Sequence, residues 1–374
     1  MININKSKEI INKIEKEEKI SKEDALTLLS SFEYDNNINI KTLNDEEKEE
    51  VKNLKEYLKL KAREKADKIF GKYVFMRGLI EFTNYCKNDC IYCGIRKSNK
   101  NAERYRLNKE DILSCCELGY EIGFRTFVLQ GGEDPYYNLE TMSDIVESIK
   151  AKYPDCALTL SIGEKEEVYY KTLKEKGANR FLLRHETSDN IHYSKLHPED
   201  MSLENRKECL RTLKKLGYQT GTGIMVGSPH QTLENIADDF IFMQEIKPEM
   251  IGIGPFLPHK DTPFASEKKG ELELTLILIS ILRLIFPLSL IPATTALGTI
   301  KEGGREMGIL CGANVVMPNL SPMSVRKKYL LYNDKIATGS ESAEGVENLR
   351  RNINSIGYIL TGKRGDYDLN RYKN

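Results

Sequence analysis

The chain has 374 residues, of which 40% are hydrophobic and 30% charged, as in an ordinary globular protein. Basic and acidic residues both number 56, so the sequence lacks the basic excess of a protein whose main partner is nucleic acid. The first residues contain no apolar signal-peptide core, which predicts a cytoplasmic protein. The apolar stretch 274–286 falls short of the roughly 20 residues of a membrane span. It contains Arg283 and predicts a buried packing helix, so no membrane partner is expected.

Residues 1–75 are predicted to form a helical extension. Ser21 begins a sequence that resembles a capping box, and Asn44 can cap a later, longer helix. Gly71 is well suited to end that helix. Its apolar residues recur three or four positions apart, which indicates one buried face: Val51, Leu54, Leu58, Ala62, Ala66 and Ile69.

Between residues 76 and 330, short apolar segments alternate with amphipathic helical segments. The predicted strands are Gly78–Thr83, Arg125–Gln130, Ala157–Ser161, Arg180–Arg184, Gln219–Ile224, Met250–Gly254, Ser289–Thr294 and Asn314–Met317. Predicted helices between them include Lys109–Leu118, Met142–Lys150, Leu203–Leu216 and Leu233–Glu245. Alternating strands and helices predict an α/β fold with a parallel sheet, and eight units favour a closed (β/α)8 TIM-type barrel. The active site of such a barrel lies at the carboxyl ends of its strands.

The last segment, residues 331–374, is polar. It predicts a helical cap at Ala343–Ile359 and a loose tail after Lys363.

Three cysteines follow the first predicted strand with the spacing Cys86-x3-Cys90-x2-Cys93. Such a compact loop can wrap three thiolates around one iron–sulfur cubane, which leaves one iron open for catalysis. A structural zinc site or a plain electron-transfer cluster would normally have a fourth ligand nearby. Disulfides are not expected without an export signal. The other cysteines are interpreted as core residues: Cys115, Cys116, Cys156, Cys209 and Cys311.

Polar and glycine residues also follow the next two predicted strands. Gly131 and Gly132 would let the backbone approach a ligand closely, although a simple tight turn would use the same residues. Glu133 can accept a hydrogen bond from an ammonium group. Ser161 ends the third predicted strand.

The fourth predicted strand ends in an Arg-His-Glu sequence. Arg184 and Glu186 occupy alternate positions and should point to the same side, with His185 opposite them as a packing or orienting residue. The planar guanidinium of Arg206 suits a carboxylate such as that of methionine, and a surface ion pair on a helix is the alternative. Met225, after the fifth strand, is either a cavity residue or part of the core.

The cysteine spacing, with an aromatic residue directly before the last cysteine, resembles the signature of the radical S-adenosylmethionine (SAM) superfamily. The resemblance implies one [4Fe-4S] cluster on Cys86, Cys90 and Cys93, whose open iron is chelated by SAM. It implies reductive cleavage of SAM to methionine and a 5′-deoxyadenosyl radical. It also implies that the Gly131–Glu133 turn holds the SAM amino group.

Longer sequence strings resemble the HydE family, the radical SAM maturases of the [FeFe]-hydrogenase H-cluster. The match spans about residues 40–360, and its most specific strings are Gly132–Tyr137 and Arg184–Thr187. The resemblance implies that Ser161, Glu186 and Arg206 hold SAM, with Arg184 beside it. It implies a substrate cavity that Thr294, Thr295, Tyr329 and Tyr332 line or cover, and Met225 is a further candidate for this cavity.

The HydE resemblance also implies a substrate and partners. The substrate would be an iron complex carrying cysteine, CO and cyanide, supplied by the maturase HydG and attacked at the cysteine sulfur. The product would pass towards the scaffold protein HydF, and a ferredoxin or flavodoxin would donate the electron. Some HydE proteins carry a second cysteine trio near the C-terminus, but the matching stretch 335–345 contains no cysteine, which predicts a single cluster.

Three other functions stay open at this point. Methylornithine synthase, which acts on lysine, shares the cluster loop and the barrel. Biotin synthase does so too, but the extra cysteines and the barrel arginine that bind its second cluster are not evident here. A non-catalytic iron–sulfur or zinc scaffold is the alternative outside the enzymes.

Overall fold

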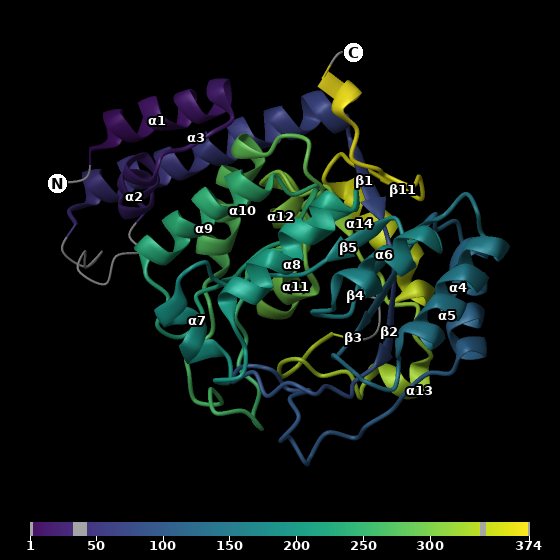
Figure 1. Ribbon diagram of the computed structural model, residues 1–374. Helices are drawn as coiled ribbons and strands as arrows, with labels where there is room; N and C mark the ends of the chain where they lie inside the picture. The colour runs from purple at the N-terminus through teal and green to yellow at the C-terminus, as the bar shows by residue number, and fades with distance from the viewer. Residues whose placement is uncertain (1–2, 33–42, 337–341, 373–374) are drawn as a thin grey trace.

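The computed structural model describes residues 3–32, 43–336 and 342–372, and its centre is a six-stranded parallel sheet (Figure 1). Its strands, in spatial order, are β2 (Gly78–Thr83), β3 (Thr126–Gly131), β4 (Ala157–Ser161), β5 (Arg180–Leu182), β6 (Gln219–Thr222) and β8 (Met250–Ile251). Neighbouring strands in this order pair in parallel throughout. The prediction of an α/β fold with a parallel sheet is therefore confirmed.

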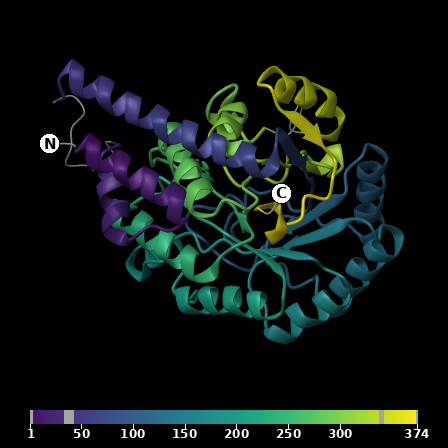
Figure 2. The ribbon, with the colours of Figure 1, turned by 90° about the horizontal axis from the view of Figure 1, so that it is seen from above.

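Helices follow the strands and cover the outside of the sheet, where Figure 2 shows them along its curved face. They are α4 (Lys109–Glu121), α5 (Leu139–Lys152), α6 (Glu167–Glu175), α7 (Asn190–Leu196), α8 (Leu203–Lys215) and α9 (Leu233–Ile246). The four helices predicted in this region form within a few residues of the expected bounds. Asn108 and Thr232 cap α4 and α9 through capping boxes, which explains why these helices start where the sequence indicates.

Beyond β8, pairing continues through isolated parallel bridges. Met250 pairs with Leu290, Pro292 with Val315, and Leu79 of β2 with Asn319. The predicted strand Ser289–Thr294 is wrong as a regular strand, because only two of its residues make bridges. Pro292 has no amide hydrogen for a continuous ladder, which is one physical reason. The predicted eighth strand shortens to β10 (Val315–Val316).

Two small sheets flank the main one. The strands β7 (Met225–Val226) and β9 (Gly254–Pro255) pair beyond the ends of β6 and β8. The predicted strands Gln219–Ile224 and Met250–Gly254 are therefore too long, because each is interrupted at a glycine. Gly223 has a φ of +154°, and a Cβ on it would lie 1.9 Å from the carbonyl oxygen of Gly252, so only glycine allows this close crossing.

The N-terminal residues form three helices, α1 (Ile4–Glu17), α2 (Lys22–Ser30) and α3 (Asp45–Phe70). Ser21 caps α2, and Asn44 forms a complete capping box with Glu47 at the start of α3. All six apolar residues predicted for the buried face of α3 are buried. This face packs along α10 (Leu272–Ile285), whose side chains from Leu274 onward are buried, as predicted for that apolar stretch.

The C-terminal region differs from the prediction. The expected helix Ala343–Ile359 consists of a 3-10 turn, η3 (Ala343–Gly345), and α14 (Val346–Ser355). Gly357, with φ +80°, turns the chain into β11 (Ile359–Thr361), which pairs with β1 (Tyr73–Met76). Helices α11 (Thr295–Ile300), α12 (Gly304–Leu310) and α13 (Met323–Arg326) and the 3-10 turn η4 (Leu369–Tyr372) complete the described elements.

The predicted loose tail after Lys363 is also wrong. The guanidinium of Arg180 donates to the carbonyl oxygens of Arg364 and Gly365 and pairs with Asp366 at 2.7 Å. Because Arg180 is fully buried at the start of β5, these bonds hold the tail across the amino ends of the strands. The sequence signal for this contact is Arg180 itself, a charged residue at the start of a predicted strand with no obvious partner nearby in the sequence.

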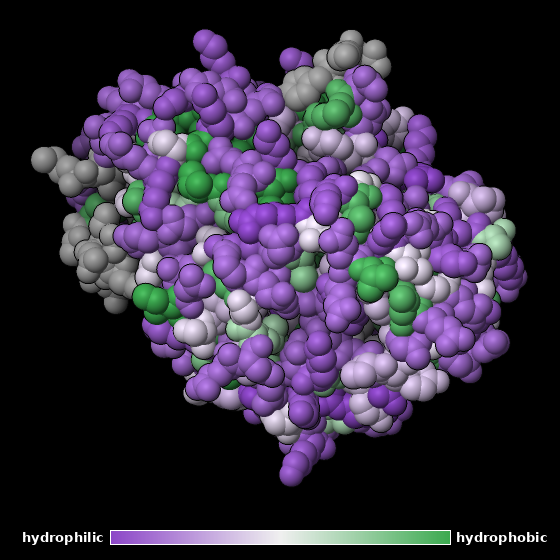
Figure 3. Space-filling model, in the orientation of Figure 1, coloured by the Kyte–Doolittle hydropathy of each residue, from purple (hydrophilic) through white to green (hydrophobic). Residues whose placement is uncertain are grey.

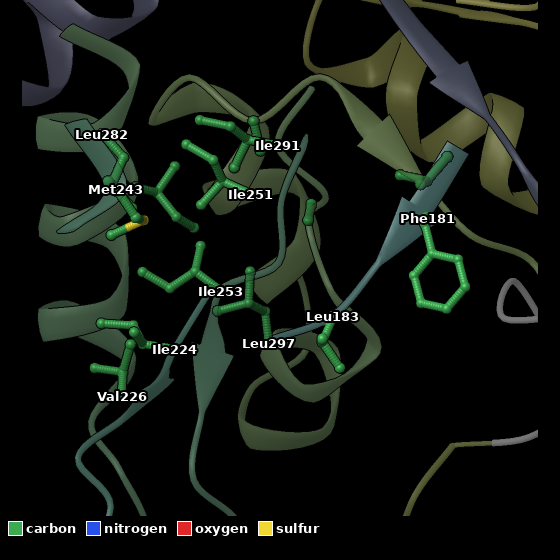
Figure 4. Close-up of a cluster of buried hydrophobic side chains, with 14 of the residues drawn as sticks. Phe181, Leu183, Ile224, Val226, Met243, Ile251, Ile253, Leu282, Ile291 and Leu297 are labelled. Atoms are coloured by element: carbon green, nitrogen blue, oxygen red, sulfur yellow. The ribbon is translucent and has the colours of Figure 1, made fainter. Parts of the chain in front are cut away.

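The main core lies between the strands and their helices. Figure 4 shows Ile251 and Ile253 facing Met243 of α9 and Leu282 of α10. All four side chains are buried, and each contributes roughly 1.5–3 kcal/mol by leaving water. The surface in Figure 3 is mostly hydrophilic with scattered apolar patches. No helix among the described residues has both the length and the apolarity that crossing a membrane requires.

Candidate active site

The three cysteines Cys86, Cys90 and Cys93 lie on an irregular loop that leaves the carboxyl end of β2 and runs along the lower edge of the molecule in Figure 1. All three are half-buried, and none forms a disulfide. The five other cysteines are buried and free, as expected of core residues. The loop therefore lies at the carboxyl end of a strand, where the active site of a barrel is expected.

Side chains hold this loop in shape together with scattered backbone hydrogen bonds, such as those from the amides of Lys87 and Ile91 to the carbonyl oxygens of Glu133 and Leu196. Asn84 donates to the carbonyl oxygen of Glu103 at 2.9 Å and accepts from the amide of Tyr105 at 2.8 Å. The guanidinium of Arg104 donates to the carbonyl oxygens of Ile95 and Arg96, at 2.9 and 2.6 Å. A long loop fixed by so many bonds can present three thiols in one direction without a helix or a strand.

Burial raises the pKa of all three thiols. The pKa of Cys93 is raised to about 12 by burial first and by Cys86 second. Burial likewise raises the pKa of Cys86, and it raises that of Cys90 well above the usual range. Because metal binding requires thiolates, binding of a cluster at these cysteines releases protons.

The glycine turn after β3 packs directly against the cysteine loop. A Cβ on Gly132 would lie 2.2 Å from the carbonyl oxygen of Tyr85 and 2.7 Å from Cβ of Cys86. A Cβ on Gly131 would lie 2.8 Å from the side chain of Thr83. Both glycines are thus required by close contact, and the turn is part of the wall behind Cys86.

The Glu133 carboxylate lies beside this turn and is nearly buried, at 6% exposure. One of its oxygens accepts from the amide of Glu164 at 3.0 Å, and the other lies 3.3 Å from the ammonium of Lys87. The Lys87 side chain is 54% exposed and free to move, so another ammonium group can replace it. Glu133 is therefore a carboxylate that is fixed on one side and exchangeable on the other.

The predicted charged residues after β5 and on α8 form one network. Arg184 donates to Glu186 at 2.6 Å, so the two side chains point to the same side, as their alternate positions predict. Arg206 donates to the carbonyl oxygen of Arg184 at 3.1 Å, and its Nε lies 2.5 Å from a carboxylate oxygen of Glu164. Arg206 is only 8% exposed. It is therefore not the surface ion pair that was the alternative interpretation.

His185 points away from this network, as predicted, and is fully buried. Its Nδ1 lies 2.7 Å from the hydroxyl of Thr222, and its Nε2 lies 3.3 Å from the carboxylate of Asp239. Glu186 has a positive φ of +65°, a strained value for glutamate. The buried histidine anchors the backbone next to that residue.

Two other predicted residues, Ser161 and Tyr329, adjoin the carboxyl ends of the strands, which are called the mouth here. Ser161 ends β4 in register with Gln130 of β3. Tyr329 is 2% exposed, and its hydroxyl accepts a hydrogen bond from Gln130 at 3.4 Å. Burial raises the pKa of Tyr329 and of Tyr332 well above the usual range.

Thr294 and Thr295 begin α11, where Thr294 is the N-cap residue. The buried hydroxyl oxygen of Thr294 has no hydrogen-bond partner among the described residues. A Cβ on Gly254 would lie 2.9 Å from this oxygen, so Thr294 packs against β9. A buried hydroxyl without a partner is a group that a bound ligand can satisfy.

Met225 belongs to a small hydrophobic cluster with Leu196, Phe256 and Phe264, against which Ile91 and Tyr92 of the cysteine loop pack. Its side chain is 7% exposed. This position favours the core interpretation, in which Met225 supports the cysteine loop from behind.

Several residues of this region were missed by sequence reasoning. Glu164 lies three residues beyond the predicted strand end at Ser161, and its carboxylate faces Arg206 while its amide donates to Glu133. Glu81 and Lys335 form a buried ion pair beside Tyr329. A glutamate inside an otherwise apolar predicted strand was the signal for Glu81, whereas nothing in the local sequence marks Lys335.

Among the described residues, no group of three or more His, Cys, Asp or Glu side chains is arranged to hold a single metal ion. The donor set does fit an iron–sulfur cluster, because three thiols share one loop and the wall behind them is kept free by glycine. Glu133 and Arg206, of opposite charge, flank the loop on the side of β3 and α8. Together these charges suit a ligand that carries an ammonium and a carboxylate group.

In a comparison with protein families, residues 80–243 match the model of the radical SAM superfamily. Among curated proteins, the [FeFe] hydrogenase maturase subunit HydE of Thermotoga maritima is 48% identical over 296 residues. That alignment covers 78% of this chain and 84% of the relative. The 3-methylornithine synthase of Methanosarcina acetivorans is 34% identical, over 68% of this chain and 72% of the relative.

Solved structures with the same arrangement include methylornithine synthase (PylB). It has a TM-score of 0.75 and 27% identity, and the match covers 94% of this chain and 97% of that one. The crystal structure of HydG, a maturase of the [FeFe]-hydrogenase, has a TM-score of 0.77 over 99% of this chain and 78% of that one. Its identity is 18%, so this similarity concerns the fold alone.

Proposed function

The chain belongs to the HydE family of radical SAM enzymes, and from this premise we propose which residues act in [FeFe]-hydrogenase maturation and how. It is a radical SAM enzyme whose cofactors are a [4Fe-4S] cluster and SAM. The observation that carries the assignment is the 48% identity over 84% of the Thermotoga maritima HydE sequence. A cytoplasmic location stays a prediction.

We assign Cys86, Cys90 and Cys93 as the ligands of the single cluster. When bound, the cluster supplies one electron that cleaves SAM to methionine and a 5′-deoxyadenosyl radical. Asn84 and Arg104 fix the backbone of the loop that carries the three thiols. The glycine turn keeps the wall behind Cys86 free of side chains.

The methionine part of SAM matches the two exchangeable charges of the site. Glu133 would take the ammonium group in place of Lys87, while the amide of Glu164 keeps the carboxylate oriented. Arg206 would bind the SAM carboxylate, which would replace part of its present contact with Glu164. The turn glycines Gly131 and Gly132, together with Ser161, Arg184, Glu186 and Tyr329, complete the proposed SAM-binding set.

The substrate we propose is the iron complex carrying cysteine, CO and cyanide, with its sulfur as the atom attacked. The buried hydroxyl of Thr294, which has no partner among the described residues, would form a hydrogen bond with this substrate. Thr295 and Tyr332 complete the proposed cavity, whereas Met225 packs in the core against the cysteine loop. HydG as supplier, HydF as recipient and a ferredoxin or flavodoxin as electron donor belong to the same proposal.

We also propose that the sheet closes into a (β/α)8 barrel over residues 76–330. The support is the series of parallel bridges from β8 through Leu290, Pro292 and Val315, together with the bridge from Asn319 back to Leu79. Residues 1–75 would be a helical extension and residues 331–374 a C-terminal cap.

The test is anaerobic incubation of the reconstituted, dithionite-reduced protein with SAM, with and without the iron–cysteine complex. We expect 5′-deoxyadenosine release that the complex strongly stimulates, with a new organometallic signal in electron paramagnetic resonance. Slow release that ignores the complex would refute this substrate. No release at all would refute the ligand and SAM assignments.

A parallel sample with lysine tests the second candidate. The 34% identity to methylornithine synthase and the TM-score of 0.75 to its structure favour this alternative. Stimulation by lysine rather than by the iron complex would transfer the assignment to an amino-acid mutase.

A further inference from the structure

A short segment, residues 328–335, crosses the mouth of the strands and is called the strap here. At one end, Asn84 of the cysteine loop donates to the carbonyl oxygen of Lys328 at 2.8 Å, and the amide of Gly94 donates to Leu331 at 2.9 Å. At the other end, the amide of Asn333 donates to the carbonyl oxygen of Pro258 at 3.0 Å. The strap therefore bridges the loop after β2 and the loop after β9, above the proposed site.

One buried ion pair ties the strap to the wall of the sheet. The ammonium of Lys335 pairs with the carboxylate of Glu81 on β2 and also donates to the carbonyl oxygen of Tyr329 at 3.1 Å. The two charged side chains are 8% and 1% exposed. The other carboxylate oxygen of Glu81 accepts from Asn319 at 2.8 Å, so both carboxylate oxygens are satisfied.

The pair lies in the same layer as the proposed SAM residues. Glu81 is in register with Gln130 of β3, and Gln130 is in register with Ser161 of β4. Gln130 also donates to the hydroxyl of Tyr329, whose ring lies 4.8 Å from the Lys335 ammonium. Lys335 therefore contacts Tyr329 at both its carbonyl oxygen and its ring.

We propose that Glu81 and Lys335 form a latch that positions the strap, with Tyr329 and Tyr332, over the bound SAM and substrate. The inference rests on the proposed function of the site. A buried pair resists partial opening, because separating the charges leaves both without compensation in a dry environment. The latch therefore keeps the strap closed during the reaction and has to part when SAM or its products are exchanged.

Three variants separate a latch from a purely structural ion pair. Lys335→Met and Glu81→Gln each leave one buried charge unpaired, so both should lower the unfolding midpoint. The double variant Glu81→Gln/Lys335→Met contains no buried charge and should recover much of this stability. It still lacks the attraction that closes the strap, so SAM release from it should stay fast.

The measurement is the dissociation rate of labelled SAM from the reconstituted, anaerobic full-length protein, chased with unlabelled SAM. We expect Lys335→Met and the double variant to release SAM about 10-fold faster or more, since the attraction of a buried pair is lost in both. Lys335→Arg keeps the charge and should stay within about 3-fold of wild type. Lys109→Met, which breaks an exposed pair with Asp144, is the matched control and should change nothing.

A second readout does not depend on SAM. Because the chain contains no tryptophan, Ile336→Trp provides a single fluorescent reporter next to the latch. The latch predicts that Lys335→Met and the double variant change its emission and speed amide exchange across residues 328–336. Wild-type release rates and unchanged exchange in the double variant would overturn the latch. If wild-type protein fails to bind SAM while the reporter responds, the proposed function fails and the strap attachment stands.

Discussion

Two buried arginines stand at opposite ends of the same strands, and their surroundings differ. At the amino ends, Arg180 is fully buried and binds Asp366, two tail carbonyl oxygens and the amide oxygen of Gln219. At the carboxyl ends, Arg206 has one carboxylate partner, Glu164, and one carbonyl partner, Arg184. The first arginine is enclosed by its own chain, whereas the second faces a carboxylate that a ligand can replace.

We therefore interpret Arg180 as a structural residue, whereas Arg206 is the residue that we propose for the SAM carboxylate. A guanidinium has five donors. Arg180 lies at the amino ends of the strands, called the floor here, and donates to two tail backbone oxygens that cannot move away without unfolding the tail. Arg206 lies at the carboxyl ends, the mouth, and shares Glu164 with Asn205, which donates to the same carboxylate at 2.5 Å. Burial alone therefore does not distinguish the two arginines, but the kind of partner does: tail backbone oxygens for Arg180 and a side-chain carboxylate for Arg206.

The largest effect is expected at the cysteine loop of the mouth. Replacing Cys86, Cys90 or Cys93 with Ala should reduce 5′-deoxyadenosine release to background, because three ligands are the minimum that holds the cluster here. Iron content and release rate in reconstituted protein are the measurements. Cys115→Ala removes a buried thiol outside the mouth and should keep full activity. Retained SAM cleavage in any one of the three loop variants would refute its assignment as a ligand.

The next largest effect should come from the floor. Arg180→Met removes the donor of the Gly365 carbonyl oxygen and one partner of Asp366, which keeps its pair with Arg364 at 2.7 Å, so we expect a loss of about 1–3 kcal/mol of folding free energy. Urea unfolding measures this loss. Because the floor is remote from the proposed SAM residues, SAM affinity of the folded fraction should not change. A stable Arg180→Met protein would mean that the tail does not depend on this arginine.

The fold was largely predictable, and its errors have a common cause. Strands β2 and β4 form as predicted, because each is a mostly apolar segment that ends in a polar residue. Errors cluster where long-range pairing decides the backbone. Thr361 belongs to β11 because β1 pairs with it, and the tail is held by Arg180, Thr126 and Gln219. Such partners are far apart in the sequence and leave no local pattern.

The site was predictable where one loop carries several of its residues. The cysteine spacing and the alternation of Arg184 and Glu186 are local, and the structure places these residues at the mouth as expected. Lys335 was not predictable, because its partner Glu81 is far along the chain. A lysine in a polar segment is normally solvated, and only the fold brings it to a buried carboxylate.

Replacing Arg206, at the mouth, should affect SAM binding, unlike replacing Arg180, at the floor. Arg206→Ala should weaken SAM binding by more than about 1 kcal/mol, the lower end for a charged hydrogen bond, because the SAM carboxylate loses its guanidinium. Equilibrium binding of SAM to reconstituted protein measures this. Arg206→Lys keeps the charge without the planar fork and should lie between the two. Unchanged SAM affinity in Arg206→Ala would remove this residue from the binding site and equate it with Arg180.

The smallest expected effect is a pH dependence of folding stability that comes from His197. Arg180 contributes no such dependence, because its guanidinium stays charged. His197 stacks on Tyr193 with ring centroids 4.0 Å apart, and its Nδ1 lies 3.1 Å from the carbonyl oxygen of Tyr193. Its Nε2 lies 3.4 Å from the hydroxyl of Tyr92. These contacts suit a neutral ring that donates through Nδ1 and accepts through Nε2. Burial lowers the pKa of His197 to about 3.

The sign of the effect follows from the lowered pKa. Between the ordinary histidine value of about 6.5 and the folded value, only the unfolded chain binds the proton, so stability falls as the pH falls. The loss is at most about 1.4 kcal/mol for each pH unit in this window. Urea unfolding of wild type and His197→Gln at about pH 7 and about pH 5 tests it, because glutamine does not titrate. His192 and His259 are present in both proteins and cancel in the difference. The same acid-induced loss in both proteins would mean that His197 is already solvated when the mouth is folded.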